Sequence, residues 1–188
     1  MANTDAAFGF RPVANDGGVF NGQSRLVYFP SAVTTAYIGD VVKLNSTAAL
    51  GLTGAQAVET ADTTDAAYGV VVSFLANPDN LSLQYKPTQT ERYANIVLAD
   101  NQLFEIQESA NIGLAGVGFN AEFSTATGST VTGYSNCELV SAGIANTAGL
   151  GLQVVGGVGR PDNDLTASNA VWLVKFNDTQ SVQGRTGV

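Results

Sequence analysis

The sequence predicts an all-β fold, an antiparallel barrel or sandwich with an extended N-terminal arm and long low-complexity loops. Short apolar runs recur along the chain, several with two-residue alternation, and no long stretch has the 3.6-residue period of an amphipathic helix. Gly, Pro, Asn and Asp separate these runs and favour turns. Hydrophobic residues make up 45% of the chain and charged residues only 13%, the rest being rich in small neutral side chains. Such an exterior can pack against another protein at low desolvation cost.

The expected elements follow in chain order. Residues 1–25 have no regular period and are expected to form an extended arm, residues 26–180 a single β-rich domain, and residues 181–188 a loose C-terminal tail. Strands are expected at residues 26–29, 37–44, 68–75, 81–85, 92–99, 102–108, 119–124, 137–140, 152–155 and 171–177.

Two of these segments alternate clearly enough to assign a buried face. In QLFEIQE, Phe104 and Ile106 point to one side of the strand and the polar residues to the other. In VWLVKFN, Trp172, Val174 and Phe176 share a face. This alternation is typical of half-buried antiparallel strands.

The connections differ in length. Asp100-Asn101, between two expected strands, predicts the tip of a tight hairpin. Residues 45–67 and 124–136 are low in complexity and long for plain connectors, so we expect them to make contacts of their own.

Charge and cysteine content limit the partners. Eight basic and sixteen acidic side chains give a net charge of −8, with no basic run. Nucleic acid and anionic membranes are therefore not expected partners. The single cysteine, Cys137, cannot form an internal disulfide, which is consistent with a reducing cytosol. The first residues lack the pattern of a signal peptide, and no apolar stretch reaches the length of a membrane span.

Catalytic signals are weak, so we expect neither an enzyme nor a bound cofactor or metal. The chain has no histidine, and Cys137 is expected to be a buried strand residue. VVGGVGRP lacks the helix that a phosphate loop needs, so it is interpreted as a strand end with a bulge or turn. PDND is interpreted as a capped turn rather than a calcium loop. Glu105 and Glu108 lie on opposite faces of one strand and do not form a catalytic pair by themselves.

Several motifs in order suggest a family. MANTDAAFGFRPV is followed by YIGDVVKL, YGVVVSF, ANIVLADNQLFEIQES and VVGGVGRPDNDLTASNAVWLVKFNDTQ. From Met1 to about Gln180 this order resembles a family of capsid decoration (cement) proteins of tailed bacteriophages. The resemblance implies a β-rich subunit, without cofactor, that is made in the host bacterial cytoplasm. It would bind the major capsid protein on the outer surface of the virion, as a homotrimer. A full major capsid protein is not expected, because the chain is short and poor in helix signals.

The opening segment is the candidate contact site. We hypothesise that Phe8 and Phe10 dock into a groove on a capsid subunit or neighbouring protomer, with Arg11 as a polar anchor beside Pro12. The other interpretation is that the phenylalanines cover the end of their own barrel.

Two other functions remain open. A carbohydrate-binding or adhesive β-domain of a phage fibre or spike would use exposed aromatic residues, for which Tyr85, Tyr93 and Tyr134 are available. Trp172 is also aromatic, but its alternation with Val174 indicates the core. A hydrolase that uses carboxylates alone is the third possibility.

Overall fold

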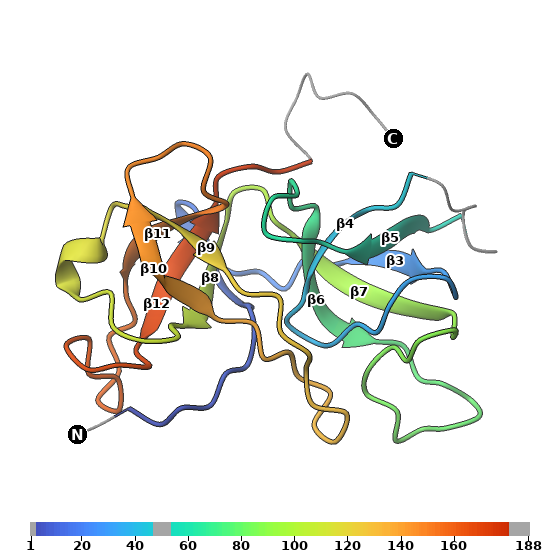
Figure 1. Ribbon diagram of the computed structural model, residues 1–188. Coiled ribbons are helices and arrows are strands. Elements are labelled where there is room, and N and C mark those ends of the chain that lie inside the picture. Colours follow the sequence, from blue (N-terminus) through green and yellow to red (C-terminus); the bar gives the residue numbers. More distant parts are fainter. Residues whose placement is uncertain (1–2, 47–53, 181–188) are drawn as a thin grey trace.

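The computed structural model describes residues 3–46 and 54–180, and it is all-β, as the sequence predicts (Figure 1). A single 3-10 turn, η1 (Leu114–Gly116), is the helical element of this part of the chain. The strands are β1 Arg11–Asn15, β2 Gly18–Val19, β3 Arg25–Phe29, β4 Val41–Leu44, β5 Gln56–Thr60, β6 Gly69–Phe74, β7 Arg92–Leu98, β8 Gln102–Gln107, β9 Asn120–Phe123, β10 Leu139–Ala145, β11 Leu152–Gly157 and β12 Val171–Phe176.

The strands form two sheets. A seven-stranded antiparallel sheet has the order β10-β9-β11-β12-β8-β1-β2, and β3-β5-β4-β6-β7 close into a barrel. All barrel pairs are antiparallel except β3 with β5. Along the chain, the five barrel strands therefore lie between β2 and β8 of the larger sheet. Figure 1 shows the barrel and the larger sheet side by side.

Strands β4, β6 and β7 form a barrel wall that is buried on both faces. One face packs into the core of the seven-stranded sheet, through Val41, Val70 and Val97. The other face fills the barrel, through Val42, Val71 and Ile96. This explains the consecutive valines in VVKL and GVVVSF, since the parts of a strand that are covered on both sides need no polar face.

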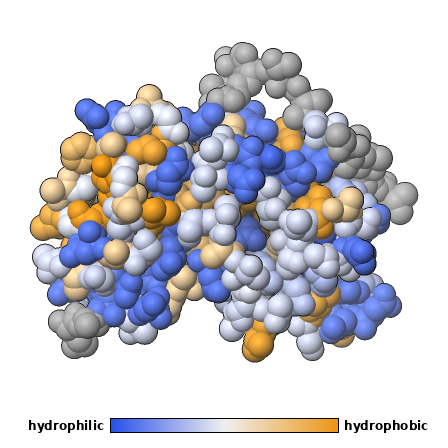
Figure 2. All heavy atoms as spheres, in the orientation of Figure 1, coloured by the Kyte–Doolittle hydropathy of each residue, from blue (hydrophilic) through white to orange (hydrophobic). Residues whose placement is uncertain are grey.

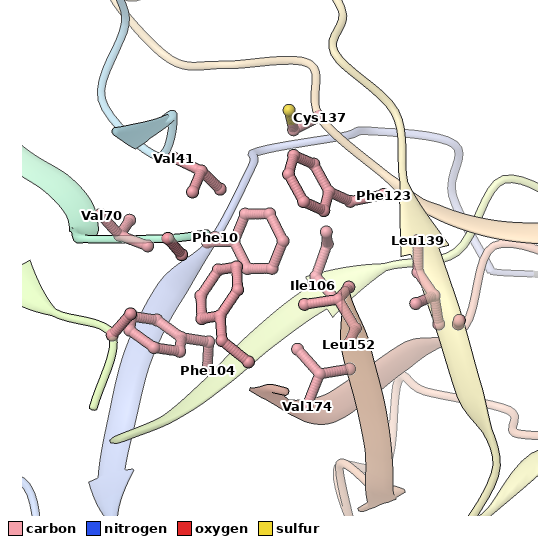
Figure 3. Packing of buried hydrophobic residues seen from close by; sticks show 14 of the residues in the cluster. Phe10, Val41, Val70, Phe104, Ile106, Phe123, Cys137, Leu139, Leu152 and Val174 are labelled. Carbon is pink, nitrogen blue, oxygen red and sulfur yellow. The ribbon is translucent and has the colours of Figure 1, made fainter. Parts of the chain in front are cut away.

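The core under the larger sheet contains a cluster of phenylalanine rings. Phe10 lies with its ring centroid 5.1 Å from that of Phe176, 5.5 Å from Phe123 and 6.2 Å from Phe104. Figure 3 shows Phe10 between Phe104 and the barrel residues Val41 and Val70. Phe10 meets Phe104 and Phe123 edge to face, and ring pairs of that geometry add about 0.5–1.5 kcal/mol each to the gain from burial.

The apolar faces predicted for β8 and β12 are confirmed, but β8 is not half-buried, since Glu105 and Gln107 on its polar face are only 5% and 4% exposed. Phe104, Ile106, Trp172 and Val174 have no exposed surface, and Phe176 is 8% exposed. These five side chains belong to one core cluster, which joins the larger sheet to the barrel wall.

The opening segment is not an extended arm throughout. β1 lies between β8 and β2 and so is an inner strand of the sheet. The sequence did not indicate this strand, because RPVAN has no clear alternation and includes a proline. Proline is tolerated because the ladder between β1 and β8 shifts register between Pro12 and Ala14. The expected tail, residues 181–188, lies outside the described residues.

Three expectations about connections change. Residues 45–67 include a barrel strand, β5, which small polar residues hid from pattern analysis; residues 47–53 lie outside the described part. Residues 81–85 form turns instead of a strand. Asp100-Asn101 is a tight turn, with Asn101 at φ 55°, but the predicted hairpin is wrong. β7 belongs to the barrel and β8 to the larger sheet, so the turn passes the chain between sheets.

Residues 124–136 have no strand, and they contact the barrel as expected. The amide of Ser135 donates to the carbonyl of Ile38 at 2.8 Å, and that of Ile38 donates to Gly133 at 2.8 Å. An added Cβ at Gly128 would lie 2.4 Å from the ring of Tyr37. The loop therefore packs closely against the segment that leads into β4.

Two backbones cross closely where the sheets meet. Phe10 N–H donates to the carbonyl of Gly39 at 2.9 Å, and Gly39 N–H donates to Val71 at 2.8 Å. Both Gly9 and Gly39 have positive φ, 72° and 95°. A Cβ at Gly9 would lie 2.7 Å from Ser135 Cβ and 2.8 Å from the oxygen of Gly39. Only glycine fits this crossing.

We predict that Gly9→Ala destabilises the protein more than Gly22→Ala. Gly22 has nearly the same φ, 73°, but nothing lies within 4 Å of the position that a Cβ would occupy there. Gly22→Ala therefore measures the cost of the left-handed backbone conformation alone. That cost is about 1–2 kcal/mol for both variants, and the clash at Gly9 adds about 1–3 kcal/mol. Urea unfolding measures the difference, and equal losses of stability would contradict the close crossing.

Candidate protein-binding site

A groove opens at the surface where the opening segment crosses between the sheets. Its volume is about 350 Å³, and we call it the junction groove. It is lined mainly by apolar and aromatic side chains with one arginine, among them Phe8, Arg11, Phe20, Ile38, Val72 and Tyr134. The lining therefore comes from the opening segment, from barrel strand β6 and from the two loops that meet at the crossing.

Arg11 is held at the rim of this groove. Its guanidinium carbon lies 4.4 Å from the centre of the Phe8 ring, and its Nη1 lies 2.9 Å from Oε1 of Glu105. The side chain of Glu105 is only 7% exposed, whereas that of Arg11 is 50% exposed. Arg160 also contacts Glu105, with 3.4 Å between Nη1 and Oε2. Arg11 is thus oriented by the protein while half of it remains available for contact.

The predicted contact residues separate into two groups. Phe8 is half-buried, Arg11 is exposed and Pro12 is half-buried, and all three line the junction groove. Phe10 also borders the groove but is only 3% exposed and lies among the core rings. The expectation that Phe10 docks into another protein is therefore wrong, because its ring already fills the core of its own chain. Sequence reasoning missed Phe20, Ile38 and Val72, whose convergence depends on the tertiary fold.

The cations of the described chain are largely used in internal contacts. Lys43 Nζ lies 2.8 Å from Asp65 Oδ2, and Arg25 Nη1 donates to Tyr68 Oη at 2.5 Å. Arg92 donates to the carbonyls of Leu75 and Tyr85, at 2.6 and 2.9 Å.

Lys86 is the most deeply buried cation of the described part. It has no exposed surface, and its Nζ donates to the carbonyls of Val33 and Thr34. This burial lowers the pKa of Lys86 to about 8. Like the three cations above, Lys86 is thus engaged within its own chain.

Asp40 is a buried carboxylate next to the crossing. It is 8% exposed, and its Oδ2 accepts the amide N–H of Tyr37 at 2.8 Å. Its carbonyl accepts from Val71 N–H at 3.0 Å. Burial raises the pKa of Asp40 to about 6, although hydrogen bonds from Ser135 and Tyr37 oppose the shift.

The two other residues considered for chemistry, Cys137 and Glu108, are buried and make structural contacts. Cys137 is 4% exposed, its Sγ lies 2.6 Å from the carbonyl oxygen of Ser124, and burial raises its pKa to about 11. Such a thiol has little thiolate at neutral pH. Glu108 is fully buried, and its carboxylate accepts the amides of Ile112 and Ala170 at 2.8 and 3.2 Å. Glu108 thus holds the loop that contains Ile112 in place.

Both glycine-rich and acidic turns have the predicted local structure. β11 shifts register between Val154 and Gly156, so VVGG is a strand end with a bulge. In the turn that follows, Asp164 Oδ1 accepts the amide of Thr166 at 2.9 Å, a side-chain cap. Among residues 3–46 and 54–180, no three acidic, cysteine or histidine side chains gather closely enough to hold a metal ion. In the same residues no helix has the length and apolarity to cross a membrane.

Comparison with known proteins adds no further information about the groove. No family model, curated protein or solved structure matches this chain.

We predict that Asp40 makes the protein less stable as pH rises. The raised pKa means that its stabilising contribution is complete below about pH 4 and is lost as pH rises through about 6. A pKa difference of about two corresponds to ~3 kcal/mol at most. An asparagine side chain at this position would stay neutral and keep an acceptor for the Tyr37 amide. Asp40→Asn should therefore be more stable than the wild type at pH 7.5 and similar at pH 4.

Urea unfolding at a series of pH values tests this prediction. Burial also raises the pKa of Glu108, Glu122 and Glu138, which contribute in the same direction in both proteins. The difference between the two curves therefore isolates Asp40. Parallel curves would contradict the role assigned to its burial.

Proposed function

We propose that this chain is a capsid decoration protein of a tailed bacteriophage. In this proposal it binds the major capsid protein on the outer surface of the assembled head and stabilises the lattice without catalysis. The observation that carries the proposal is the junction groove, where Phe8 and Arg11 are held by the chain yet remain accessible. The resemblance of the motif order to decoration proteins supplies the partner and the location in the virion.

The chemistry of the groove suits a protein partner. Aromatic and arginine side chains supply much of the binding energy in protein interfaces, especially around an apolar pocket. The salt bridge from Arg11 to Glu105 orients the guanidinium before binding, so less conformational entropy is lost on association. Arg11 and Phe8 thus form a small rigid contact rather than a flexible arm.

Such a contact would stabilise a capsid by mass action. A subunit that binds only the assembled lattice lowers the free energy of that lattice relative to its broken form. In the homotrimer that the resemblance implies, three grooves would act together, and effective concentration would make the combined binding much tighter than one contact. No enzymatic activity is needed.

The surface charge is consistent with this role. The chain has a net charge of −8, and the cations named above are mostly held by carboxylates, hydroxyls or backbone carbonyls. An outer shell protein of this kind would have no tendency to compete for packaged DNA. We therefore propose neither nucleic acid nor a membrane as a partner.

A carbohydrate-binding or adhesive domain of a phage fibre or spike is the second candidate. Tyr134 is 46% exposed, and the rings of Tyr37 and Tyr85 stack with centroids 5.4 Å apart. Tyr37 is only 3% exposed, so the exposed ring of Tyr134 is the one that could stack on a sugar. Trp172, the strongest sugar-stacking side chain in the chain, is fully buried. Selective binding of the purified protein to a glycan array would favour this candidate.

We predict that the double variant Phe8→Ala/Arg11→Ala binds undecorated heads less tightly than the wild type. Loss of two central contacts should reduce affinity by at least about tenfold. The fold should persist, because Arg160 remains beside Glu105 and Phe10 keeps its place in the core. Occupancy on purified heads, measured against protein concentration, is the readout.

The matched control is Val131→Ala, which shortens an apolar side chain that is 87% exposed and is absent from the groove lining. It should bind as the wild type does. Equal binding by a folded Phe8→Ala/Arg11→Ala variant would exclude the junction groove as the attachment site. No binding of the wild type to heads would contradict the proposed function itself.

A further inference from the structure

A second apolar surface lies on the larger sheet, around η1. Leu114 is 60% exposed, and Val117 and Phe119 are each 41% exposed. Phe119 also lines a shallow groove of about 300 Å³ together with Ile112 and Ile144. We call these five residues the η1 patch. Figure 2 shows apolar side chains gathered on the left of the molecule, over the region where Figure 1 draws η1 and β10.

The η1 patch lies within two segments of the chain that contain no charged residue. Residues 109–121 and 139–159 contain no Asp, Glu, Lys or Arg. These two segments include η1, β10 and β11, and they adjoin each other in the fold because β10 and β11 both pair with β9. The charged residues of the strands beside them are Glu122 of β9, opposite Val140, and Lys175 of β12, opposite Gln153.

The loop that carries the η1 patch is held in place by the buried carboxylate of Glu108 and by two hydrogen bonds at the surface. Glu108 Oε2 accepts the amide of Ile112 at 2.8 Å, and Asn111 Nδ2 donates to the carbonyl of Thr166 at 2.9 Å. The amide of Ala110 donates to Ser141 Oγ at 3.0 Å, which ties the loop to β10. Because the patch is ordered before any partner arrives, association would cost less conformational entropy.

β10 adds a strand edge that is covered only near its start, where the amide of Ser109 donates to the carbonyl of Leu139 at 2.9 Å. It is the outermost strand at its end of the sheet, and its pairing with β9 shifts register between Val140 and Ala145. Ala142 and Gly143 are exposed in this interval. β10 contains neither the lysine nor the proline with which proteins commonly protect an edge from pairing.

We propose that the η1 patch is the surface through which copies of this chain associate with one another. The charge distribution selects this partner. A strongly charged partner would gain no electrostatic energy from an uncharged patch, whereas two acidic chains repel each other except where charge is absent. Charges more than about 8 Å from the contact are largely screened at physiological salt. A patch without charge also never places like charges opposite each other when it meets its own copy.

This inference goes beyond the proposed function, because it assigns a surface to self-association and needs no capsid for its test. The junction groove and the η1 patch have no lining residue in common, so one surface can bind a lattice while the other binds a neighbouring copy. A monomeric protein would leave the junction groove as a capsid contact but would remove the combined binding expected of a homotrimer, whereas failure of the groove to bind heads would leave self-association in place.

The test is the mass of the purified full-length protein by sedimentation equilibrium over a wide concentration range. We expect the wild type to associate, and Leu114→Asp to raise the dissociation constant by at least about tenfold, since a carboxylate would be desolvated in the contact. Leu114 is 60% exposed, so the variant should unfold at the wild-type temperature. The control is Leu81→Asp, in which the replaced leucine is 80% exposed and lies outside the patch. It should associate as the wild type does.

Salt gives a second readout. Sodium sulfate should strengthen the association of the wild type, because it favours burial of apolar surface and screens repulsion between the copies. A contact built on ion pairs would weaken instead. A wild type that stays monomeric throughout, or equal effects of Leu114→Asp and Leu81→Asp, would overturn the proposal. So would a monomeric wild type whose Leu114→Asp variant loses binding to heads, because the patch would then face the capsid.

Discussion

The rest of the structure depends on the barrel wall formed by β4, β6 and β7, which is buried on both faces. Adjacent apolar residues of each strand point alternately into the barrel and into the core of the seven-stranded sheet. Neither sheet can move away from the other without exposing these side chains, and each fully buried valine represents about 1.5–3 kcal/mol of hydrophobic stabilisation. The crossing at Gly9 and Gly39 is possible only because the wall brings the two sheets into direct contact.

The functional surfaces follow from this arrangement. The opening segment passes over the joint before it enters β1, which puts Phe10 in the shared core and leaves Phe8 and Arg11 at the surface. The junction groove is therefore a consequence of how the sheets meet. The η1 patch has a different origin, since it lies on the far part of the larger sheet and is held by the buried carboxylate of Glu108. Both surfaces are rigid, which suits a protein that acts by binding.

Much of the fold could be predicted from the sequence, for local reasons. β8 and β12 alternate because one face of each lies on the core, and β6 is a continuous apolar run because both of its faces are covered. β1 and β5 escaped prediction because proline, alanine and small polar residues conceal strands whose stability comes from their neighbours in the sheet. The hairpin at Asp100 was wrong because a turn sequence specifies a reversal of the chain but not the sheet that the next strand joins.

The candidate site could be predicted only in part. Phe8 and Arg11 were recognised from residue type. The burial of Phe10 depends on the positive φ of Gly9 and on the rings that surround it. Phe20, Ile38 and Tyr134 reach the groove from segments far apart in the chain, so no local pattern could group them. The charge-free segments at 109–121 and 139–159 were visible in the sequence, but their meeting at one surface was not.

The most direct test of this account is native-state hydrogen exchange across both sheets. If the barrel wall makes them one cooperative unit, amides in β3 and β12, on opposite sides of the wall, should exchange with the same free energy and the same denaturant dependence. That free energy should equal the global free energy of unfolding. Exchange of β3 at a distinctly lower free energy than β12, or the reverse, would show that the sheets open independently and would contradict the central claim.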